Sequence, residues 1–193
     1  MVLGIGEAVS GSLVGRIPSL KKTRPGGASM RIGILSDTHD HVENTRRALE
    51  ILRQEQVERL FHCGDVTSPE VVSLFEGWDV LFVRGNLDRL DALEPAVVAL
   101  GRQPFLGDEM TTTVAGRRIA ILHGDDTERL RQVIASGEFD YVFHGHTHRR
   151  RDERIGRTRV INPGALGGVR HESRSFCILD LETDELRFIE VEP

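Results

Sequence analysis

Aromatic residues are scarce in this sequence of 193 residues. They make up 5% of the chain, and tryptophan and tyrosine occur once each, as Trp78 and Tyr141. Proteins that bind single-stranded nucleic acids stack the bases on aromatic side chains. An excess of positive charge, which would attract polyanions, is also absent, because the formal net charge is −5. Both absences argue against nucleic acid as a partner.

Cysteine and long apolar runs are scarce as well. The two cysteines, Cys63 and Cys177, each lie in an apolar, strand-like segment. This setting predicts buried free thiols, which suit a reducing compartment, so we expect a cytoplasmic protein. No run reaches the ~20 apolar residues that a membrane-spanning helix requires, so we expect no membrane partner.

The length predicts a single domain with a substantial core. Residues 1–29 are set apart because they are rich in glycine and serine and carry several basic residues against one acid, Glu7. They contain no apolar stretch typical of a secretory signal peptide. We expect a flexible N-terminal extension, or a start codon assigned too early with Met30 as the true start, followed by a domain that spans residues 30–193.

Hydrophobic patterns in the first half of this domain predict alternating strands and helices. Residues 31–36 form an apolar run, and apolar residues then recur at helical spacing from 43 to 54. Strand-like runs at 59–63 and 79–84 follow, with a short helix between them that begins at Ser68-Pro69. Three strand–helix units in succession predict a largely parallel sheet.

The second half favours antiparallel pairs. Three turn-forming pairs each separate two strand-like runs and so predict hairpins. A helix is expected from Asp126 to Ser136, with a strand at 139–143. The whole pattern predicts an α/β fold, either one mixed sheet or two packed sheets with helices outside. The turn pairs are Ala115-Gly116, Ile155-Gly156 and Thr183-Asp184.

Polar clusters follow five of the strand-like runs. Each cluster lies where its run ends, which in an open α/β sheet is the edge where ligands bind. One such cluster is common by chance, but five in succession predict a two-metal hydrolytic site with seven candidate ligands. The clusters are Asp37-Thr38-His39, Gly64-Asp65, Gly85-Asn86, His123-Gly124 and Gly145-His146-Thr147-His148.

The residue types in these clusters suit phosphate chemistry. Carboxylates and imidazoles together bind Mn²⁺, Fe or Zn²⁺, and a carboxylate such as Asp65 can offset the repulsion between two cations by bridging them. Two-metal sites hold their ions ~3.5–4 Å apart and activate water near neutral pH. We therefore expect a metal-bridged hydroxide to attack phosphorus in line, with Asn86 helping to stabilise the developing charge.

The five clusters in this order resemble the signature of the calcineurin-like metallophosphoesterases, and the resemblance runs from Met30 to the C-terminus. The compact length and Asn162-Pro163-Gly164 are similar to the small bacterial and archaeal phosphodiesterase subgroup. That subgroup also resembles a eukaryotic retromer subunit that acts as a protein-binding scaffold. The resemblance implies two packed mixed β-sheets flanked by helices, a four-layer α-β-β-α sandwich.

The resemblance also implies a division of the seven ligands between two divalent cations. Manganese is favoured, and iron, zinc, nickel or magnesium would also fit. The substrate would be a small phosphate ester or a nucleotide-like molecule, and a homo-oligomer is compatible with the family. One ligand set is Asp37, His39 and His148, the other is Asn86, His123 and His146, and Asp65 is the bridge.

One position departs from the pattern. Many family members have histidine after Gly-Asn, where it protonates the leaving group, but this chain has Leu87. Losing a general acid typically costs ~10²–10⁴-fold in rate. The small subgroup also lacks this histidine, so we expect slower hydrolysis or substrates with good leaving groups. Asp88 and His41 are candidate replacements as catalytic residues.

Other polar residues favour structural roles. His62 and His144 precede their motifs inside strands and are expected to be packed, whereas His171 is expected in an exposed loop. The basic run from Arg149 to Arg159 is expected to be a solvated hairpin, with anion steering as the alternative. The stretch from Leu90 to Glu109 has no distinct pattern and could form a lid or a partner contact.

Two other functions remain as alternatives. The first is a non-catalytic or weakly catalytic protein-binding scaffold on the same fold, which the leucine at position 87 suggests. Intact residues at all seven ligand positions argue against it. The second is a zinc hydrolase of carbon substrates, but such enzymes need H-x-H-x-D-H on one loop, and here His148 is followed by Arg149-Arg150.

Overall fold

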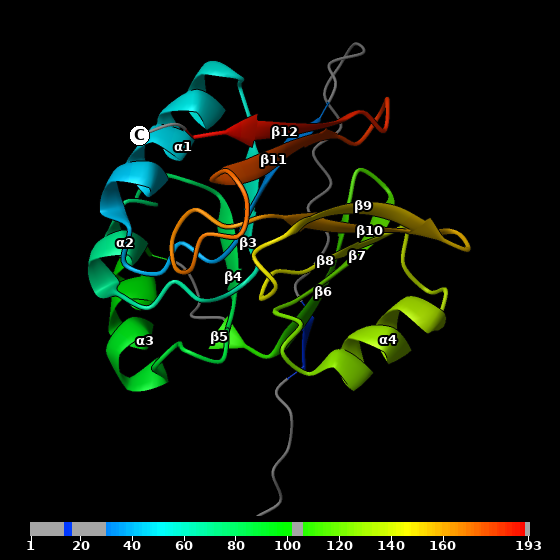
Figure 1. Cartoon of the computed structure of the whole chain (residues 1–193), viewed down its shortest axis with the longest axis horizontal. Helices are drawn as coiled ribbons and strands as arrows, with labels where there is room; N and C mark the ends of the chain where they lie inside the picture. Colours follow the sequence, from blue (N-terminus) through cyan, green and yellow to red (C-terminus); the bar gives the residue numbers. More distant parts are fainter. Residues whose placement is uncertain (1–13, 17–29, 102–105, 192–193) are drawn as a thin grey trace, which may run out of the picture.

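The computed structural model describes residues 14–16, 30–101 and 106–191. Within these ranges the chain forms two six-stranded mixed sheets that face each other, with helices on both outer sides (Figure 1). The prediction of two packed sheets in an α/β fold is therefore confirmed.

The first sheet contains the predicted parallel strands. β2, β3, β4 and β5 run parallel, and the C-terminal hairpin adds β11 antiparallel to β2 and β12 antiparallel to β11. This hairpin turns at the predicted Thr183-Asp184. The strands, in spatial order, are β12 (Leu186–Glu190), β11 (Ser175–Asp180), β2 (Arg31–Leu35), β3 (Arg59–His62), β4 (Val80–Val83) and β5 (Leu106–Gly107).

The second sheet contains the other two predicted hairpins. β6 pairs with β7, and β9 with β10, both antiparallel, whereas β8 lies between β7 and β10 and runs parallel to both. The strands, in spatial order, are β1 (Val14–Arg16), β6 (Glu109–Val114), β7 (Arg117–Leu122), β8 (Tyr141–Phe143), β10 (Thr158–Pro163) and β9 (Arg150–Ile155).

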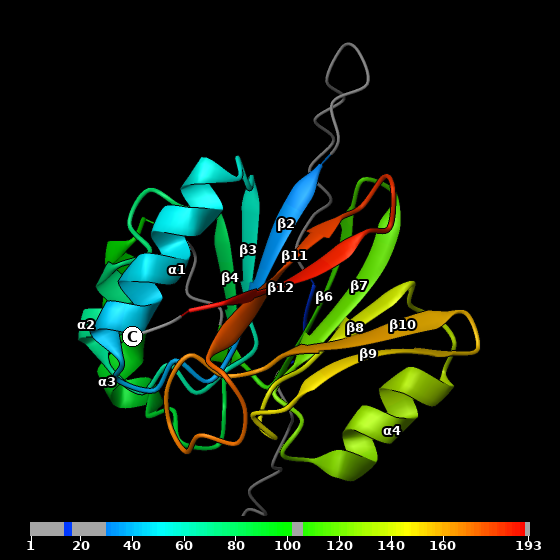
Figure 2. The same ribbon diagram turned by 45° about the horizontal axis from the view of Figure 1, so that its top comes forward.

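Four helices cover the outer faces of the sheets in the described part of the chain. Three of them lie against the first sheet, and the fourth lies against the second (Figures 1 and 2). The helices are α1 (Val42–Gln54), α2 (Pro69–Ser73), α3 (Leu90–Ala99) and α4 (Thr127–Ala135).

Three apolar clusters fill the spaces between the four layers. Neighbouring residues of a strand point to opposite faces of the sheet, so Val142 packs beneath α4 whereas Phe143 packs between the sheets. The rings of Phe61 and Phe143 meet there, with centroids 5.6 Å apart. Leu52 and other residues of the first three helices complete the remaining cluster. The predicted four-layer arrangement follows from this pattern of burial.

Two regions could not be assigned from the sequence. The stretch from Leu90 to Glu109 contains α3 and β5, and residues 102–105 within it lie outside the described part. The expected extension at 1–29 also lies largely outside it, but β1 pairs in parallel with β6. No described helix has the length and apolar character needed to cross a membrane.

Candidate metal centre

The five polar clusters meet at one edge of the sandwich. They follow β2, β3 and β4 of the first sheet and β7 and β8 of the second. In Figure 2 the connections after these strands gather near the loop between β10 and β11. Backbone hydrogen bonds join the clusters directly: Asp37 donates to the carbonyl of Gly64 at 3.0 Å, and His39 to that of Asp65 at 2.8 Å. The two sheets thus deliver their polar side chains to a common site.

One side of the site contains Asp37, His39 and His148. His148 Nε2 lies 3.2 Å from Asp37 Oδ1 and 3.3 Å from His39 Nε2. Oxygen and nitrogen donor atoms of all three side chains lie within 4.8 Å of one another. These are the three residues that the family resemblance assigns to one cation.

The other side contains Asn86, His123 and His146. Asn86 Oδ1 lies 3.1 Å from His123 Nε2 and 3.1 Å from His146 Nδ1. The two imidazole rings meet edge to face, with centroids 5.2 Å apart. The structure therefore brings together the second predicted set as well.

Two carboxylates lie between these groups. Asp65 Oδ2 is 3.5 Å from His123 Nε2, and donor atoms of Asp37, Asp65 and His123 lie within 4.8 Å of one another. Asp37 therefore lies near donor atoms of His39 and His148 on one side and of Asp65 and His123 on the other. The bridging role of Asp65 remains a prediction, and the geometry places Asp37 in an equally central position.

The spacing of the donor atoms fits bound cations. Two ligands ~2.1 Å from a shared ion, at angles of about 90–109°, lie ~3.0–3.4 Å apart. The separations of 3.1–3.3 Å within each group match this range. Asp37 Oδ1 is also buried and, while His148 Nε2 at 3.2 Å is unprotonated, has no hydrogen-bond donor, which is costly for a carboxylate unless a cation balances its charge. The residues present therefore fit divalent metal ions.

Backbone carbonyls orient two of the histidines. His123 Nδ1 lies 2.8 Å from the carbonyl oxygen of Cys63, and His148 Nδ1 lies 2.8 Å from that of Val169. A carbonyl only accepts, so each Nδ1 carries the proton, and the lone pair of the neutral ring lies on Nε2. In both residues Nε2 faces the cluster, which is the arrangement that metal-binding histidines require.

The backbone is strained at the cluster. Nine described residues other than glycine have positive φ angles, and five of them are candidate ligands. Such conformations are unfavourable for residues with a side chain and persist where surrounding contacts enforce them, often at functional sites. The five are Asp37, His39, Asp65, His146 and His148.

Two glycines of the motifs allow the loops to approach each other. A Cβ atom at Gly85 would lie 2.1 Å from Asp65 Oδ1, and one at Gly145 would lie 2.6 Å from Asp37 Oδ2. Neither distance is compatible with a side chain larger than hydrogen. Glycine before Asn86 and before His146 is therefore a packing requirement of the cluster.

The electrostatics of the cluster favour protonated histidines when no metal balances the carboxylates. Burial opposes the charge on His123, but the hydrogen bond with Asp65 and the charge of Asp37 raise its pKa to about 9. The Asp37 carboxylate likewise raises the pKa of His148. His39 differs, because burial lowers its pKa. The cluster is thus a concentrated negative site that attracts protons or cations.

Asp88 connects the loops by accepting hydrogen bonds from their backbone. Its Oδ2 accepts hydrogen bonds from the backbone N–H groups of Asp65 at 2.9 Å and Gly85 at 2.8 Å. Its Oδ1 accepts from the N–H of Thr67 at 2.8 Å. These contacts favour a positioning role for this buried carboxyl. Its role as a catalytic proton donor stays a prediction that no contact supports.

The other histidines largely follow the predicted structural roles. His62 is fully buried and packs against the rings of Phe75 and Phe82, and burial lowers its pKa to about 3. Burial likewise lowers the pKa of His144 to about 4. His41 is an exposed N-cap of α1, where its Nδ1 accepts from a backbone N–H. A catalytic role for His41 therefore stays a prediction without a contact to the cluster.

His171 and the basic hairpin complete the predicted polar residues. The ring of His171 lies beside that of His148, with centroids 6.0 Å apart, so this exposed residue is closer to the cluster than expected. The arginines of β9 and β10 are largely engaged in ion pairs: Arg159, for example, binds both Asp152 and Asp184. This pairing supports the structural interpretation of the hairpin.

Sequence reasoning missed a supporting residue in the Asn162-Pro163-Gly164 segment. Asn162 is fully buried, and its Nδ2 donates to the carbonyl of Gly145 at 2.8 Å and to Thr147 Oγ1 at 3.1 Å. It thereby holds the loop that carries His146 and His148. The segment could be recognised in the sequence, but its contact with the loop at Gly145 and Thr147 could not be inferred.

The site geometry agrees with comparisons to known proteins. A model of the calcineurin-like phosphoesterase superfamily domain matches residues 30–184. The chain belongs to this superfamily. The prediction of a metal-dependent phosphoesterase, a hydrolase, is thereby confirmed at the level of the family.

Individual relatives refine the comparison. The chain is 36% identical over 166 residues to a phosphodiesterase of Methanocaldococcus jannaschii, a match that covers 84% of this chain and 100% of that protein. A solved archaeal phosphodiesterase superposes with a TM-score of 0.79 at 36% identity, again covering 84% and 100% of the two chains.

A third similarity concerns the fold alone. The zinc-complexed structure of Vps29 from Entamoeba histolytica superposes with a TM-score of 0.61 at 19% identity, covering 81% of this chain and 89% of that one. The predicted resemblance to the scaffold subunit therefore holds for the architecture of the two sheets.

Proposed function

We propose that the protein is a phosphodiesterase that acts on small phosphodiesters with two divalent cations. Asp37, His39 and His148 would hold one cation, and the other three-residue set would hold the second, with Asp65 shared. We favour manganese, with iron, zinc, nickel or magnesium as alternatives. The position of Asp37 carries this proposal. Its carboxylate lies within 4.8 Å of donor atoms from both sides of the site, so two cations held there would be close enough to engage one phosphate group.

The roles of the chain's own residues follow from their chemistry. When bound, the metal pair supplies Lewis acidity and a nucleophilic water. Asn86 offers amide N–H donors beside the cluster, which can stabilise charge that develops on phosphate oxygens. Leu87 follows it with a side chain 54% exposed and cannot transfer a proton to the leaving group. Esters with good leaving groups, such as aryl or nucleotide diesters, are therefore the favoured substrates.

The surroundings of the site support a small substrate. No phenylalanine, tyrosine or tryptophan with a described side chain is exposed, so bases have no aromatic surface to stack on, and we propose that nucleic acid is not a substrate. Both cysteines are free and buried, which supports a cytoplasmic location because reducing compartments preserve unpaired thiols. A homo-oligomer remains part of the proposal, to be examined by light scattering.

Turnover with a panel of metals tests the proposal. Metal-depleted protein would be assayed with bis(4-nitrophenyl) phosphate and 4-nitrophenyl phosphate after addition of each of the five metals. We expect hydrolysis that requires added metal and favours the diester. Asp65→Ala should abolish it, whereas Asp91→Ala, which removes an exposed aspartate of α3, should not. Unchanged activity in Asp65→Ala would contradict the proposal.

The same measurements address the scaffold alternative. Leu87 and Val169, 54% and 67% exposed, are apolar side chains next to candidate ligands or their contacts. Exposed apolar residues can serve as partner contacts. Metal binding by calorimetry without hydrolysis of any ester in the panel would favour a protein-binding role for this edge.

A further inference from the structure

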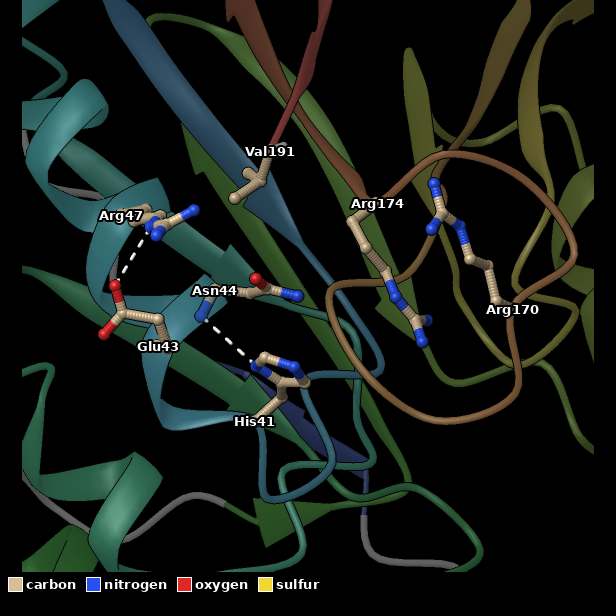
Figure 3. A pocket seen from close by; sticks show the side chains of 7 residues that line it. All are labelled: His41, Glu43, Asn44, Arg47, Arg170, Arg174 and Val191. Atoms are coloured by element: carbon tan, nitrogen blue, oxygen red, sulfur yellow. Dashed lines mark hydrogen bonds and ion pairs between the residues drawn. The ribbon is translucent and has the colours of Figure 1, made fainter. Parts of the chain in front are cut away.

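A basic pocket lies beside the candidate metal centre, between α1 and the loop that joins β10 to β11. It has a volume of about 320 Å³, within the range of about 300–1,000 Å³ that is typical of small-molecule sites. Figure 3 shows His41, Asn44 and Arg47 on the helix side and Arg170 and Arg174 on the loop side. None of these residues is a predicted metal ligand.

The charge of the pocket is positive. Three arginines line it against one acid, Glu43, which already pairs with Arg47 at 2.9 Å. Arg170 makes no hydrogen bond or ion pair with the residues that the structure describes. Burial and the nearby charge of Arg170 both lower the pKa of Arg174. Two guanidinium groups that repel each other across a pocket create a site for an anion, because a bound anion would relieve the repulsion.

The segment from Leu166 to Val169, which we call the wall, connects the pocket to the metal centre. Residues of both sites form hydrogen bonds with its backbone. On the cluster side, the N–H of Gly167 donates to the Asp37 carbonyl at 2.7 Å, and the carbonyl of Val169 accepts from His148 at 2.8 Å.

The pocket side of the wall is held by two lining residues. Asn44 Nδ2 donates to the carbonyl of Leu166 at 2.7 Å, and the guanidinium of Arg174 donates to the carbonyls of Gly167 and Gly168. His41 is also only two residues from His39, so the pocket begins within ~7.6 Å along the chain of a candidate ligand. The pocket and the metal centre therefore lie next to each other.

We propose that this pocket binds a second phosphate group of the substrate, remote from the diester that is cleaved. The inference rests on the proposed phosphodiesterase function and narrows it to substrates with two phosphate groups, such as a phosphorylated nucleotide diester. Arginine suits this task because its planar guanidinium donates two parallel hydrogen bonds to one phosphate. Arg170 would be the main specificity residue, since no hydrogen bond or ion pair with a described residue holds its guanidinium, although its charge also acts on Glu190.

A binding experiment tests the pocket without any turnover. Metal-free protein would be titrated with inorganic pyrophosphate and followed by amide NMR. We expect shifts at Asn44 and Arg174, and an affinity about 10- to 100-fold weaker in Arg170→Gln. Arg131→Gln is the matched control, because Arg131 is a highly exposed arginine of α4 on the other side of the molecule. Shifts confined to the metal cluster and equal in both variants would overturn the proposal.

A matched pair of substrates then tests the link to catalysis. Thymidine 5′-(4-nitrophenyl phosphate) would be compared with the same compound carrying a 3′-phosphate, in the metal-loaded enzyme. We expect the KM of the phosphorylated compound to be about 10- to 100-fold lower, and this advantage to disappear in Arg170→Gln with kcat unchanged. Equal KM values in the unmodified protein would overturn the substrate assignment. If neither compound is hydrolysed, the phosphodiesterase function fails, and the pyrophosphate titration still decides the pocket.

Discussion

Leu87 occupies the position at which a proton donor would be most useful. Its backbone N–H donates to Asp65 Oδ1 at 2.9 Å, so the residue is held beside the cluster while its side chain remains 54% exposed. A histidine there could extend from the same backbone without displacing core residues. Position 87 is therefore well placed for a general acid, but leucine has no proton to donate.

We predict that Leu87→His increases the hydrolysis of diesters with poor leaving groups. General acid catalysis contributes ~10²–10⁴-fold where it operates, and alkyl leaving groups need it more than aryl groups do. The ratio of kcat/KM for an alkyl and an aryl diester should therefore rise in Leu87→His and stay constant in Leu87→Ala. An equal change for both substrates would argue against proton donation at this position.

Asp88 illustrates a residue whose role depends on distant backbone. Its two oxygens accept three N–H groups from the loops after β3 and β4. In Asp88→Asn the new amide group would face at least one of these donors. We predict a loss of about 1–3 kcal/mol in the free energy of unfolding and a loss of about 10- to 100-fold in metal affinity.

Denaturant unfolding and metal titration measure both effects of Asp88→Asn. Asp91→Asn provides the control, because Asp91 is an exposed aspartate of α3 that pairs with Arg89. A catalytic proton donor would behave differently, since its loss would alter the pH–rate profile and leave metal affinity unchanged.

At the scale of elements, strands and hairpins were predictable because their signals are local. The pair Ile155-Gly156, for example, identified the turn between β9 and β10. The helix α3 was missed because it has no clear apolar face: Leu93 and Val97 are buried, Val98 is 49% exposed, and a proline lies inside it. A local sequence pattern does not predict a short helix whose buried residues are irregularly spaced.

The candidate site was predictable to the extent that its ligands are carried by motifs. Asp37, Asp65 and Asn86 each follow a strand directly, so their convergence could be inferred from the parallel order of β2, β3 and β4. The supporting contacts could not be inferred. Asn162 and the wall from Leu166 to Val169 act through backbone groups far away in the sequence, and no residue type marks such contacts.

The wall yields a prediction at Gly168, where a Cβ atom would lie 2.3 Å from His39 Nε2 and 2.7 Å from His148 Cε1. Gly168 also has a φ angle of 62°. Gly168→Ala should therefore displace the histidines and weaken metal binding by at least about tenfold. Calorimetric titration with Mn²⁺ measures this loss.

Gly156→Ala is a matched control for Gly168→Ala. Gly156 has a φ angle of 60°, but no atom lies within 4 Å of the position its Cβ would take. Both substitutions carry the same backbone penalty of about 1–2 kcal/mol, and only Gly168→Ala adds the clash. Equal metal affinity in the two variants would show that the wall does not position the histidines.

At the scale of the whole molecule, the cluster depends on both sheets. β2, β3 and β4 deliver Asp37, His39, Asp65 and Asn86, whereas β7 and β8 deliver His123, His146 and His148. Any cation bound by both groups would link the layers, and metal binding would then contribute to the stability of the packed sandwich. Loading by metal at 100 times its Kd stabilises a fold by about 2.7 kcal/mol.

Protons compete with metal for this site, and the raised pKa of His123 determines how metal affinity changes with pH. His123 has a pKa of about 9 in the metal-free fold against an ordinary value of 6.5. Its protonated form stabilises the metal-free protein fully below pH 6.5, and this contribution is lost as pH rises through about 9. Metal requires the neutral ring, so metal affinity should rise over the same window.

We therefore predict that metal raises the melting temperature more at pH 9 than at pH 6.5. At 100 times Kd near pH 9 the increase should be about 5–10 °C for a domain of this size, and chelation should reverse it. Binding near pH 7 should release a proton, because His123 must lose the one that Asp65 and Asp37 retain on it. Calorimetry of metal binding in two buffers of different ionisation enthalpy counts that proton, and identical apparent enthalpies in both buffers would refute the competition.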